Sequence, residues 1–198
     1  LVGLALSEVI APLLPPPHRP ELKWPNDVLV GGAKLAGILL EGEGPAVVVG
    51  VGVNLAAAPE LADRRTAALS AFGPAPDRDT FATSLARQLV IELERWRNFG
   101  IEPIVRRWLA AGHPPGTALE VGEPGEAPLA GKFAGLTTDG ALQLALADGT
   151  TRTIEVTLAR TDTTEIERGY TGQRGQDEQN RRSSKAPVKR SEPNTLVH

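Results

Sequence analysis

The strongest constraint on the fold is a pair of apolar runs separated by two glycines. Residues 28–30 read Val-Leu-Val, Gly31-Gly32 follows directly, and residues 34–41 form a second run. Two consecutive glycines supply the positive φ angles that a two-residue hairpin turn requires. We therefore expect an antiparallel β-hairpin in this part of the chain.

Further strands are expected on both sides of the hairpin. Residues 46–54 place valine at every second position, which is typical of a strand. Residues 21–24 form a short strand, and the sequence Pro-Asn-Asp at residues 25–27 is typical of a turn. The four segments together predict an antiparallel meander.

Helices are predicted before and after this meander. Residues 1–14 carry an apolar pattern suited to a buried helix, and three prolines end it. In residues 81–96, apolar side chains recur every three or four positions, and we expect Asp79 or Thr80 to cap this helix. A shorter helix is expected at residues 104–111.

The pattern changes to short strands after residue 112. The predicted strands are residues 118–121, 129–136, 141–146 and 151–156. Asp139-Gly140 and Asp148-Gly149 stand between such runs, and Asp-Gly is a strong hairpin signal. We expect an α+β domain in residues 1–112 and a small SH3-like β-barrel domain in residues 116–158.

Residues 161–198 contain few apolar side chains, too few to bury a core, so we expect a disordered tail. The formal net charge is −3 and the pI is about 5.7, which does not support DNA binding by this chain. The absence of cysteine excludes disulfides and thiolate zinc sites. No apolar run has the length of a membrane span, and a cytoplasmic protein is expected.

The residues that suggest chemistry lie between Lys23 and Asn54. Asn26 and Asp27 stand at a turn, and Lys34 comes close to them if the hairpin forms. Gly50 and Gly52 leave room for a ligand beside the third strand. A cation near an acid, an amide and glycines suits an anionic ligand that carries phosphate. The alternative is a plain hairpin with a surface salt bridge.

Aromatic and histidine residues outside this stretch carry less information. We expect Trp96 and Trp108 to serve helix packing and Trp24 to anchor the core, whereas His18 and His113 flank prolines in loops and have no predicted role.

Three motifs in this stretch resemble the biotin–protein ligase family in order and spacing. They are Trp-Pro-Asn-Asp at residues 24–27, Lys-Leu-Ala-Gly-Ile-Leu at residues 34–39, and Gly-Val-Gly-Val-Asn at residues 50–54. The resemblance extends to about residue 158. It implies the class II synthetase-like catalytic fold, a mixed or antiparallel sheet with helices, followed by the SH3-like barrel.

The resemblance also implies an activity. ATP, with Mg²⁺, activates biotin as biotinyl-AMP, and a lysine of a biotin carboxyl carrier protein then receives the biotin. Lys34 matches the lysine that contacts the biotin carboxyl and the phosphate. Asp27 and Asn26 match the acid and amide that organise the adenylate, the magnesium or the incoming lysine, with a turn-capping side chain as the alternative for Asn26. Asn54 matches a residue placed to bind adenine, with an ordinary strand terminator as the alternative. Gly37 matches a glycine whose backbone lies close to the biotin ring, with a β-bulge as the alternative, and Gly52 matches a glycine that lines the ligand.

Alternatives remain open at this point. A lipoate-ligase-like transferase shares the fold, and an inactive adenylate-binding fragment is the third reading. The family carries a glycine- and arginine-rich loop that would precede Leu1, so we expect the chain to be a fragment without that loop. A homodimer stays open as a further partner.

Overall fold

The computed structural model describes residues 1–43, 45–62, 64–122, 128–155 and 159–160. Its elements are α1 (Val2–Ile10), η1 (Ala11–Leu13), β1 (Pro20–Lys23), β2 (Asp27–Val30), β3 (Ala33–Glu43), β4 (Ala46–Val53), η2 (Leu69–Ala71), α2 (Arg78–Phe99), α3 (Glu102–Ala111), β5 (Ala118–Val121), β6 (Leu129–Leu136), β7 (Leu142–Ala145), β8 (Thr151–Ile154) and β9 (Ala159–Arg160). The predicted tail at residues 161–198 lies outside the described residues.

The predicted meander is confirmed as the main sheet. Strands β1 to β4 follow one another as antiparallel neighbours, and β9 adds a short parallel pairing to β3. Gly31 and Gly32 have φ angles of 57° and 73°. These left-handed conformations are the ones that the hairpin turn requires, and glycine adopts them without a steric cost.

A β-bulge interrupts the pairing of β2 with β3. Val28 lies opposite Ala36, but the next residue, Leu29, lies opposite Lys34, so Leu35 is an extra residue in β3. Leu35 and Ala36 are consecutive and both are buried. The bulge therefore lets the neighbouring side chains of Leu35 and Ala36 both enter the core. It also shifts the alternation of side chains in β3, so that Lys34 points to the face of the sheet opposite the core.

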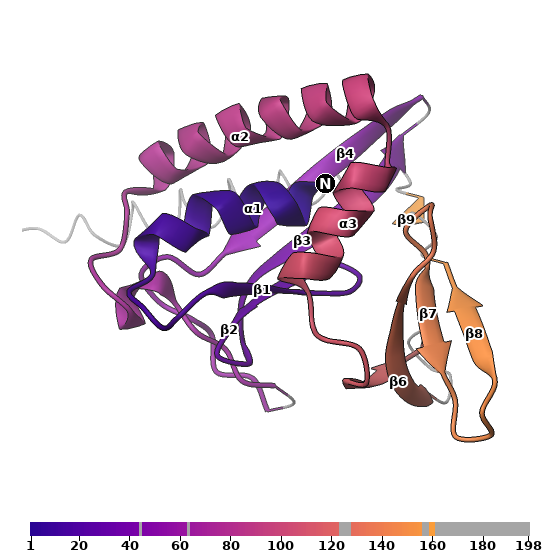
Figure 1. Ribbon diagram of the computed structural model, residues 1–198. Coiled ribbons are helices and arrows are strands. Elements are labelled where there is room, and N and C mark those ends of the chain that lie inside the picture. The colour runs from indigo at the N-terminus through magenta and orange to yellow at the C-terminus, as the bar shows by residue number, and fades with distance from the viewer. Residues whose placement is uncertain (44, 63, 123–127, 156–158, 161–198) are drawn as a thin grey trace, which may run out of the picture.

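Helices α1 and α2 cover one face of the main sheet (Figure 1). The core between them and the sheet includes Leu6, Leu22, Leu35, Phe81 and Leu85, among other apolar side chains. At about 25 cal/mol per Å² of buried apolar surface, this layer is the chief source of stability. It fixes which face of the sheet is left for other contacts.

Two details of α2 differ from the prediction. The N-cap is Asp77 rather than Asp79 or Thr80, because its carboxylate accepts from the backbone N–H groups of both of those residues. Trp96 was expected to be packed, but it is 47% exposed because the end of α2 extends past the core. Trp108 of α3 packs against the core as predicted.

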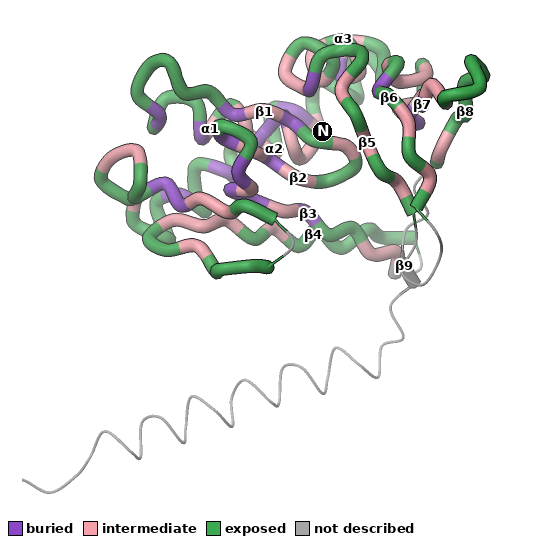
Figure 2. The backbone as a smooth tube through the Cα atoms, turned by 90° about the horizontal axis from the view of Figure 1, so that it is seen from below, coloured by how far each residue is buried: buried purple, intermediate pink, exposed green. Residues whose placement is uncertain are grey.

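The opposite face of the main sheet has no helix against it in the described residues (Figure 2). The residues that point to this face follow from the register and include Asp27, Gly37, Leu39, Gly50 and Gly52. Leu39 is 54% exposed, and the outer part of β4 is exposed along its length. Val48 is also exposed on this face, and exposed apolar side chains that gather on one surface are a common mark of a binding surface.

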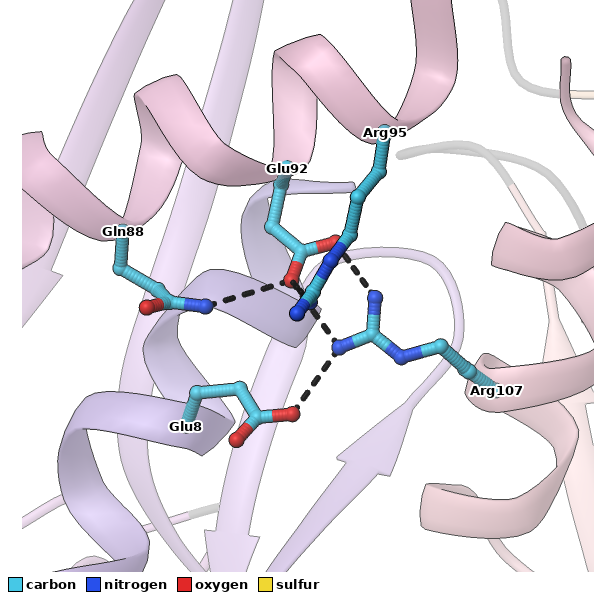
Figure 3. A network of polar contacts seen from close by, with 5 residues as sticks. All are labelled: Glu8, Gln88, Glu92, Arg95 and Arg107. Carbon is cyan, nitrogen blue, oxygen red and sulfur yellow. Dashed lines mark hydrogen bonds and ion pairs between the residues drawn. The ribbon is translucent and has the colours of Figure 1, made fainter. Parts of the chain in front are cut away.

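A network of charged side chains ties the three helices together (Figure 3). Glu92 of α2 is fully buried and is paired with Arg95 of the same helix and with Arg107 of α3. Arg107 also donates to Glu8 of α1, and Gln88 donates to Glu92. Burial alone would raise the pKa of Glu92, but the hydrogen bonds and charges of the arginines hold it below its ordinary value.

The second sheet is antiparallel and four-stranded, in the order β5-β6-β7-β8. Phe133, Leu142 and Leu144 form its buried centre. Barrel closure is not tested by the described residues, so the SH3-like barrel stays a prediction. Within the same residues, no helix combines the length and the apolar character needed to cross a membrane.

Candidate functional site

Lys34 and Asp27 meet on the open face of the main sheet, as the hairpin predicted. The Lys34 Nζ atom lies 2.5 Å from Asp27 Oδ1, and the two side chains are 29% and 13% exposed. The bulge places Lys34 across from Leu29, which is two residues along β2 from Asp27, the partner of Gly37. The pair is thus partly screened from solvent, which strengthens its interaction with a charged ligand.

Gly37 leaves the space through which the Lys34 side chain passes. A β-carbon at Gly37 would lie 3.1 Å from Lys34 Nζ and 3.6 Å from Asp27 Oδ1. The first distance is tighter than an ordinary contact, so a side chain here would push the ammonium group away. Gly37 therefore serves the geometry of the ion pair, a role that the sequence did not reveal.

Gly52 lies directly opposite Gly37 on β4, and Gly50 lies opposite Leu39. A β-carbon at Gly52 would meet no atom within 4 Å, so the surface there is open. Glycines on neighbouring strands make a shallow floor beside Lys34. A flat ligand can approach the backbone of such a floor closely.

Asn26 is fixed to β3 by two hydrogen bonds. Its side-chain Nδ2 donates to the carbonyl of Ile38 at 2.6 Å, and the N–H of Ile38 donates to the carbonyl of Asn26 at 2.9 Å. The amide side chain thus extends the pairing of β2 with β3 by one residue. These bonds favour the turn-capping alternative for Asn26. Its predicted part in catalysis remains a proposal.

Asn54 fastens a loop beside Lys34. Its Nδ2 donates to the carbonyl of Ala67 at 3.0 Å and, more weakly, to that of Lys34 at 3.4 Å. The backbone of Lys34 also bonds to this loop, donating to Arg65 and accepting from Ala67, both at 2.9 Å. No pattern in the sequence indicates this contact between the loop and Lys34.

A cavity of about 470 Å³ lies beside Asn26, between the two sheets. Its lining residues come from five places: Leu1, the Trp24–Asn26 turn, the middle of β3, helix α3 with the preceding Ile101, and the end of β6 with Asp139 and Gly140 of the β6–β7 turn. The indole Nε1 of Trp24 donates to the Gly140 carbonyl at 3.4 Å. The sequence marked Asp139-Gly140 only as a turn, and its place next to the Trp-Pro-Asn-Asp motif is a finding of the structure.

His113 and His18 lie outside this site. His113 is buried between Trp108 and Phe133, and its Nε2 atom has no hydrogen-bond partner among the described residues. Burial lowers the pKa of His113. The charge of Glu21 has a smaller effect that raises this pKa, and the charge of Lys23 has a smaller effect that lowers it. Among the described residues, no group of three His, Cys, Asp or Glu side chains could hold a metal ion.

Comparison with known proteins identifies the class first. Residues 18–55 match the model of the Biotin/lipoate A/B protein ligase family. This range contains the Lys34–Asp27 pair and the neighbouring glycines of the candidate site. The predicted resemblance is confirmed by two relatives, and the chain is similar to biotin–protein ligases.

Both relatives are named biotin–[acetyl-CoA-carboxylase] ligase, which is a class of enzyme. The protein from Mycobacterium tuberculosis is 49% identical over 98 residues, covering 48% of this chain and 37% of its own. The protein from Paracoccus denitrificans is 38% identical over 160 residues, covering 73% of this chain and 64% of its own. The chain thus spans between about one third and two thirds of these relatives.

The fold is also similar to that of a solved structure. The biotin protein ligase from Aquifex aeolicus in complex with biotin and ATP superposes with a TM-score of 0.65 at 24% sequence identity. The match covers 77% of this chain and 65% of that chain. At this identity the likeness confirms the predicted fold class of helices on an antiparallel sheet.

Proposed function

We propose that the chain contains the nucleotide-side part of a biotin–protein ligase, which activates biotin with ATP and transfers it to a carrier lysine. The observation that carries the proposal is the Lys34–Asp27 pair above a glycine floor. The relatives named as biotin ligases and the solved ligase with bound biotin and ATP supply the substrates.

In the first step, a carboxylate oxygen of biotin attacks the α-phosphorus of ATP. A new O–P bond forms, the bond to the bridging oxygen of the β-phosphate breaks, and pyrophosphate leaves with its electron pair. Two anions must meet in this step, and the ammonium group of Lys34 lowers the cost of their approach. Lys34 forms an ion pair with Asp27, which holds its position before the substrates arrive.

In the second step, the neutral ε-amine of a carrier lysine attacks the acyl carbon of biotinyl-AMP. The amide bond forms, the C–O bond to the phosphate breaks, AMP leaves, and the nitrogen loses a proton to solvent or to a nearby base. Asp27 lies within the site and is proposed to assist the incoming lysine, while Asn26 holds the turn that carries Asp27.

Magnesium is proposed to arrive with ATP. Mg²⁺ takes one or two protein carboxylates and otherwise keeps waters and phosphate oxygens. Asp27 offers one partly exposed carboxylate, which fits such a site, and the Asn26 amide oxygen is its neighbour in the chain. The ion would neutralise phosphate charge during the first step.

The remaining site residues are assigned on the same basis. Gly37 and Gly52 are proposed to lie under the biotin and the acyl phosphate, because a ligand can approach their backbone closely. Asn54 is proposed to serve adenine binding by holding the loop that its Nδ2 already bonds, at Ala67.

Two features support the proposal that further chain completes this site. Leu39 and Val48 point to the open face and are 54% and 40% exposed. An apolar surface next to the proposed biotin site suits a further segment of chain that packs on it, such as a glycine- and arginine-rich loop. Residues 1–112 are then part of the catalytic domain, and residues 116–158 form the SH3-like barrel domain. A homodimer remains a proposal, and the ATP requirement favours the cytoplasm.

The test measures pyrophosphate release and the mass of a purified biotin carboxyl carrier domain, with biotin and MgATP. The variant Lys34→Ala, made in this chain and in a version extended upstream, should reduce adenylate formation by about 10²-fold or more without unfolding. Lys132→Ala, at an exposed position of β6, is the control. Equal activity of Lys34→Ala and wild type would overturn the assignment of Lys34, and no activity in either wild-type version would overturn the ligase proposal.

A further inference from the structure

The cavity beside Asn26 is shared by the two sheets. Trp24 and Asn26 line one side, and Asp139 and Gly140 of the β6–β7 turn line another. Most of the wall is apolar and includes Ile104 and Trp108. Among these lining residues, Asp139 has the charged side chain. The cavity therefore combines an apolar wall with one carboxylate.

The β6–β7 turn is held rigidly toward the cavity. The N–H of Gly140 donates to the carbonyl of Thr137 at 3.0 Å, and the N–H of Ala141 donates to the Thr137 hydroxyl at 2.9 Å. Gly140 has a φ of 94°, a conformation that other residues rarely adopt. This geometry turns the Gly140 carbonyl toward the indole N–H of Trp24, which bonds to it.

Asp139 is held as a carboxylate at this position. The Thr137 hydroxyl donates a hydrogen bond to Asp139 Oδ1. That bond lowers the pKa of Asp139, as do the smaller effects of nearby backbone N–H groups. A charged carboxylate beside an apolar wall suits a ligand with a long apolar stem and a cationic end.

We propose that Asp139 is a positioning residue of the second sheet that receives the ammonium group of the carrier lysine before transfer. The inference rests on the proposed ligase function, which requires such a lysine to reach Asn26 and Asp27. A lysine side chain has four methylene groups and one charged end, so its stem fits the apolar wall and its end fits the carboxylate. The hydrogen bond from Trp24 fixes the second sheet, and therefore Asp139, relative to the site.

The chain contains a matched control at the next hairpin. Asp148-Gly149 has the same turn chemistry, because Thr150 donates to Asp148 through both its N–H and its hydroxyl, and Gly149 has a φ of 85°. The Thr150 hydroxyl bond lowers the pKa of Asp148 as well. Asp148 does not line the cavity, so substitutions there reproduce the local effect on a turn without the effect on the lysine.

The first experiment compares Asp139→Asn with Asp148→Asn in the ligase reaction. Asp139→Asn should raise the KM for the carrier domain about five-fold, while pyrophosphate release trapped with hydroxylamine stays unchanged, since this small acceptor needs no guidance. Asp139→Glu should restore most of the loss, and Asp148→Asn should match wild type. Equal carrier KM values for Asp139→Asn and wild type would overturn the proposal and leave the ligase function standing.

The second experiment measures binding without turnover. A carrier domain and a version with its acceptor lysine changed to glutamine are titrated against wild type and against Asp139→Asn, following Trp fluorescence. Changing the acceptor lysine to glutamine should weaken binding of the carrier domain to the wild-type chain. It should not weaken binding to Asp139→Asn any further, and this non-additivity would show that Asp139 and the acceptor lysine interact. Additive effects would overturn the proposal. A wild-type chain that forms adenylate but binds no carrier would also overturn it. A wild-type chain that neither forms adenylate nor binds the carrier would overturn the ligase function.

Discussion

Glu92 of α2 and Arg107 of α3 form a two-bond ion pair in which Arg107 Nη1 lies 2.6 Å from Oε2 and Nη2 lies 2.9 Å from Oε1. The carboxylate is fully buried and Arg107 is 30% exposed. Such parallel bonds fix both distance and orientation. The pair therefore sets the angle between the two helices that cover the core and the cavity.

Glu92→Gln should lower the free energy of unfolding by about 2 kcal/mol, because it leaves two arginines beside an uncharged buried group. Glu94→Gln, at an exposed position of the same helix, is the control and should change stability by less than about 0.5 kcal/mol. Urea unfolding followed by circular dichroism gives both values. Equal losses in the two variants would contradict a specific role of the buried pair.

Gly37→Ala should displace the Lys34 ammonium group without unfolding the sheet. The added β-carbon would lie 3.1 Å from Lys34 Nζ, whereas a β-carbon at Gly73, away from the site, would meet no atom within 4 Å. We expect adenylate formation to fall about ten-fold or more in Gly37→Ala and to change little in the control Gly73→Ala. The rate of pyrophosphate release is measured for both variants, and their melting temperatures show whether they are folded. Equal rates in the two variants would contradict the prediction.

Asn54→Ala should release the loop that contains Arg65 and Ala67 from its place beside Lys34. The loss of the bonds to the two carbonyls should lower stability by about 1 kcal/mol. Faster hydrogen exchange at the N–H groups of Lys34 and Ala67, which bond across the loop, is the direct measurement. Unchanged exchange there would show that the backbone bonds hold the loop without the side chain.

His113 should make stability depend on pH below neutrality. Burial lowers the pKa of His113 below the ordinary 6.5, so the unfolded chain binds a proton more readily than the folded one. This contribution is complete above pH 6.5 and is lost as the pH falls toward the folded pKa, by up to about 1.4 kcal/mol for each pH unit. Other groups titrate in the same pH range. The contribution of His113 is therefore obtained as the difference in pH dependence between wild type and a variant that lacks this imidazole.

The variant for this comparison is His113→Phe, which keeps an aromatic ring between Trp108 and Phe133. It should lose less stability than wild type between pH 7 and pH 5.5 in urea unfolding. His18→Gln is the control because that imidazole lies at the surface. A pH slope in His113→Phe equal to that of wild type would exclude His113 as its source.

The strands and turns of this protein were predictable because their signals are local. Gly31-Gly32 fixes a hairpin through backbone sterics, and alternating valines in β4 fix a strand through side-chain direction. The motif order also located Lys34 and Asp27 correctly beside each other. Each of these inferences needs only residues that are near one another in the chain.

The sequence by itself therefore determined the meander, the two helices that follow it, the second sheet and the family to which its motifs point. Only the tertiary structure decided the bulge at Leu35, the loop bonded to Asn54, the burial of Glu92 and the place of Asp139 next to Trp24. These features join segments as much as 116 residues apart. Their energy comes from packing and hydrogen bonds that exist only after distant elements meet, so no local pattern records them.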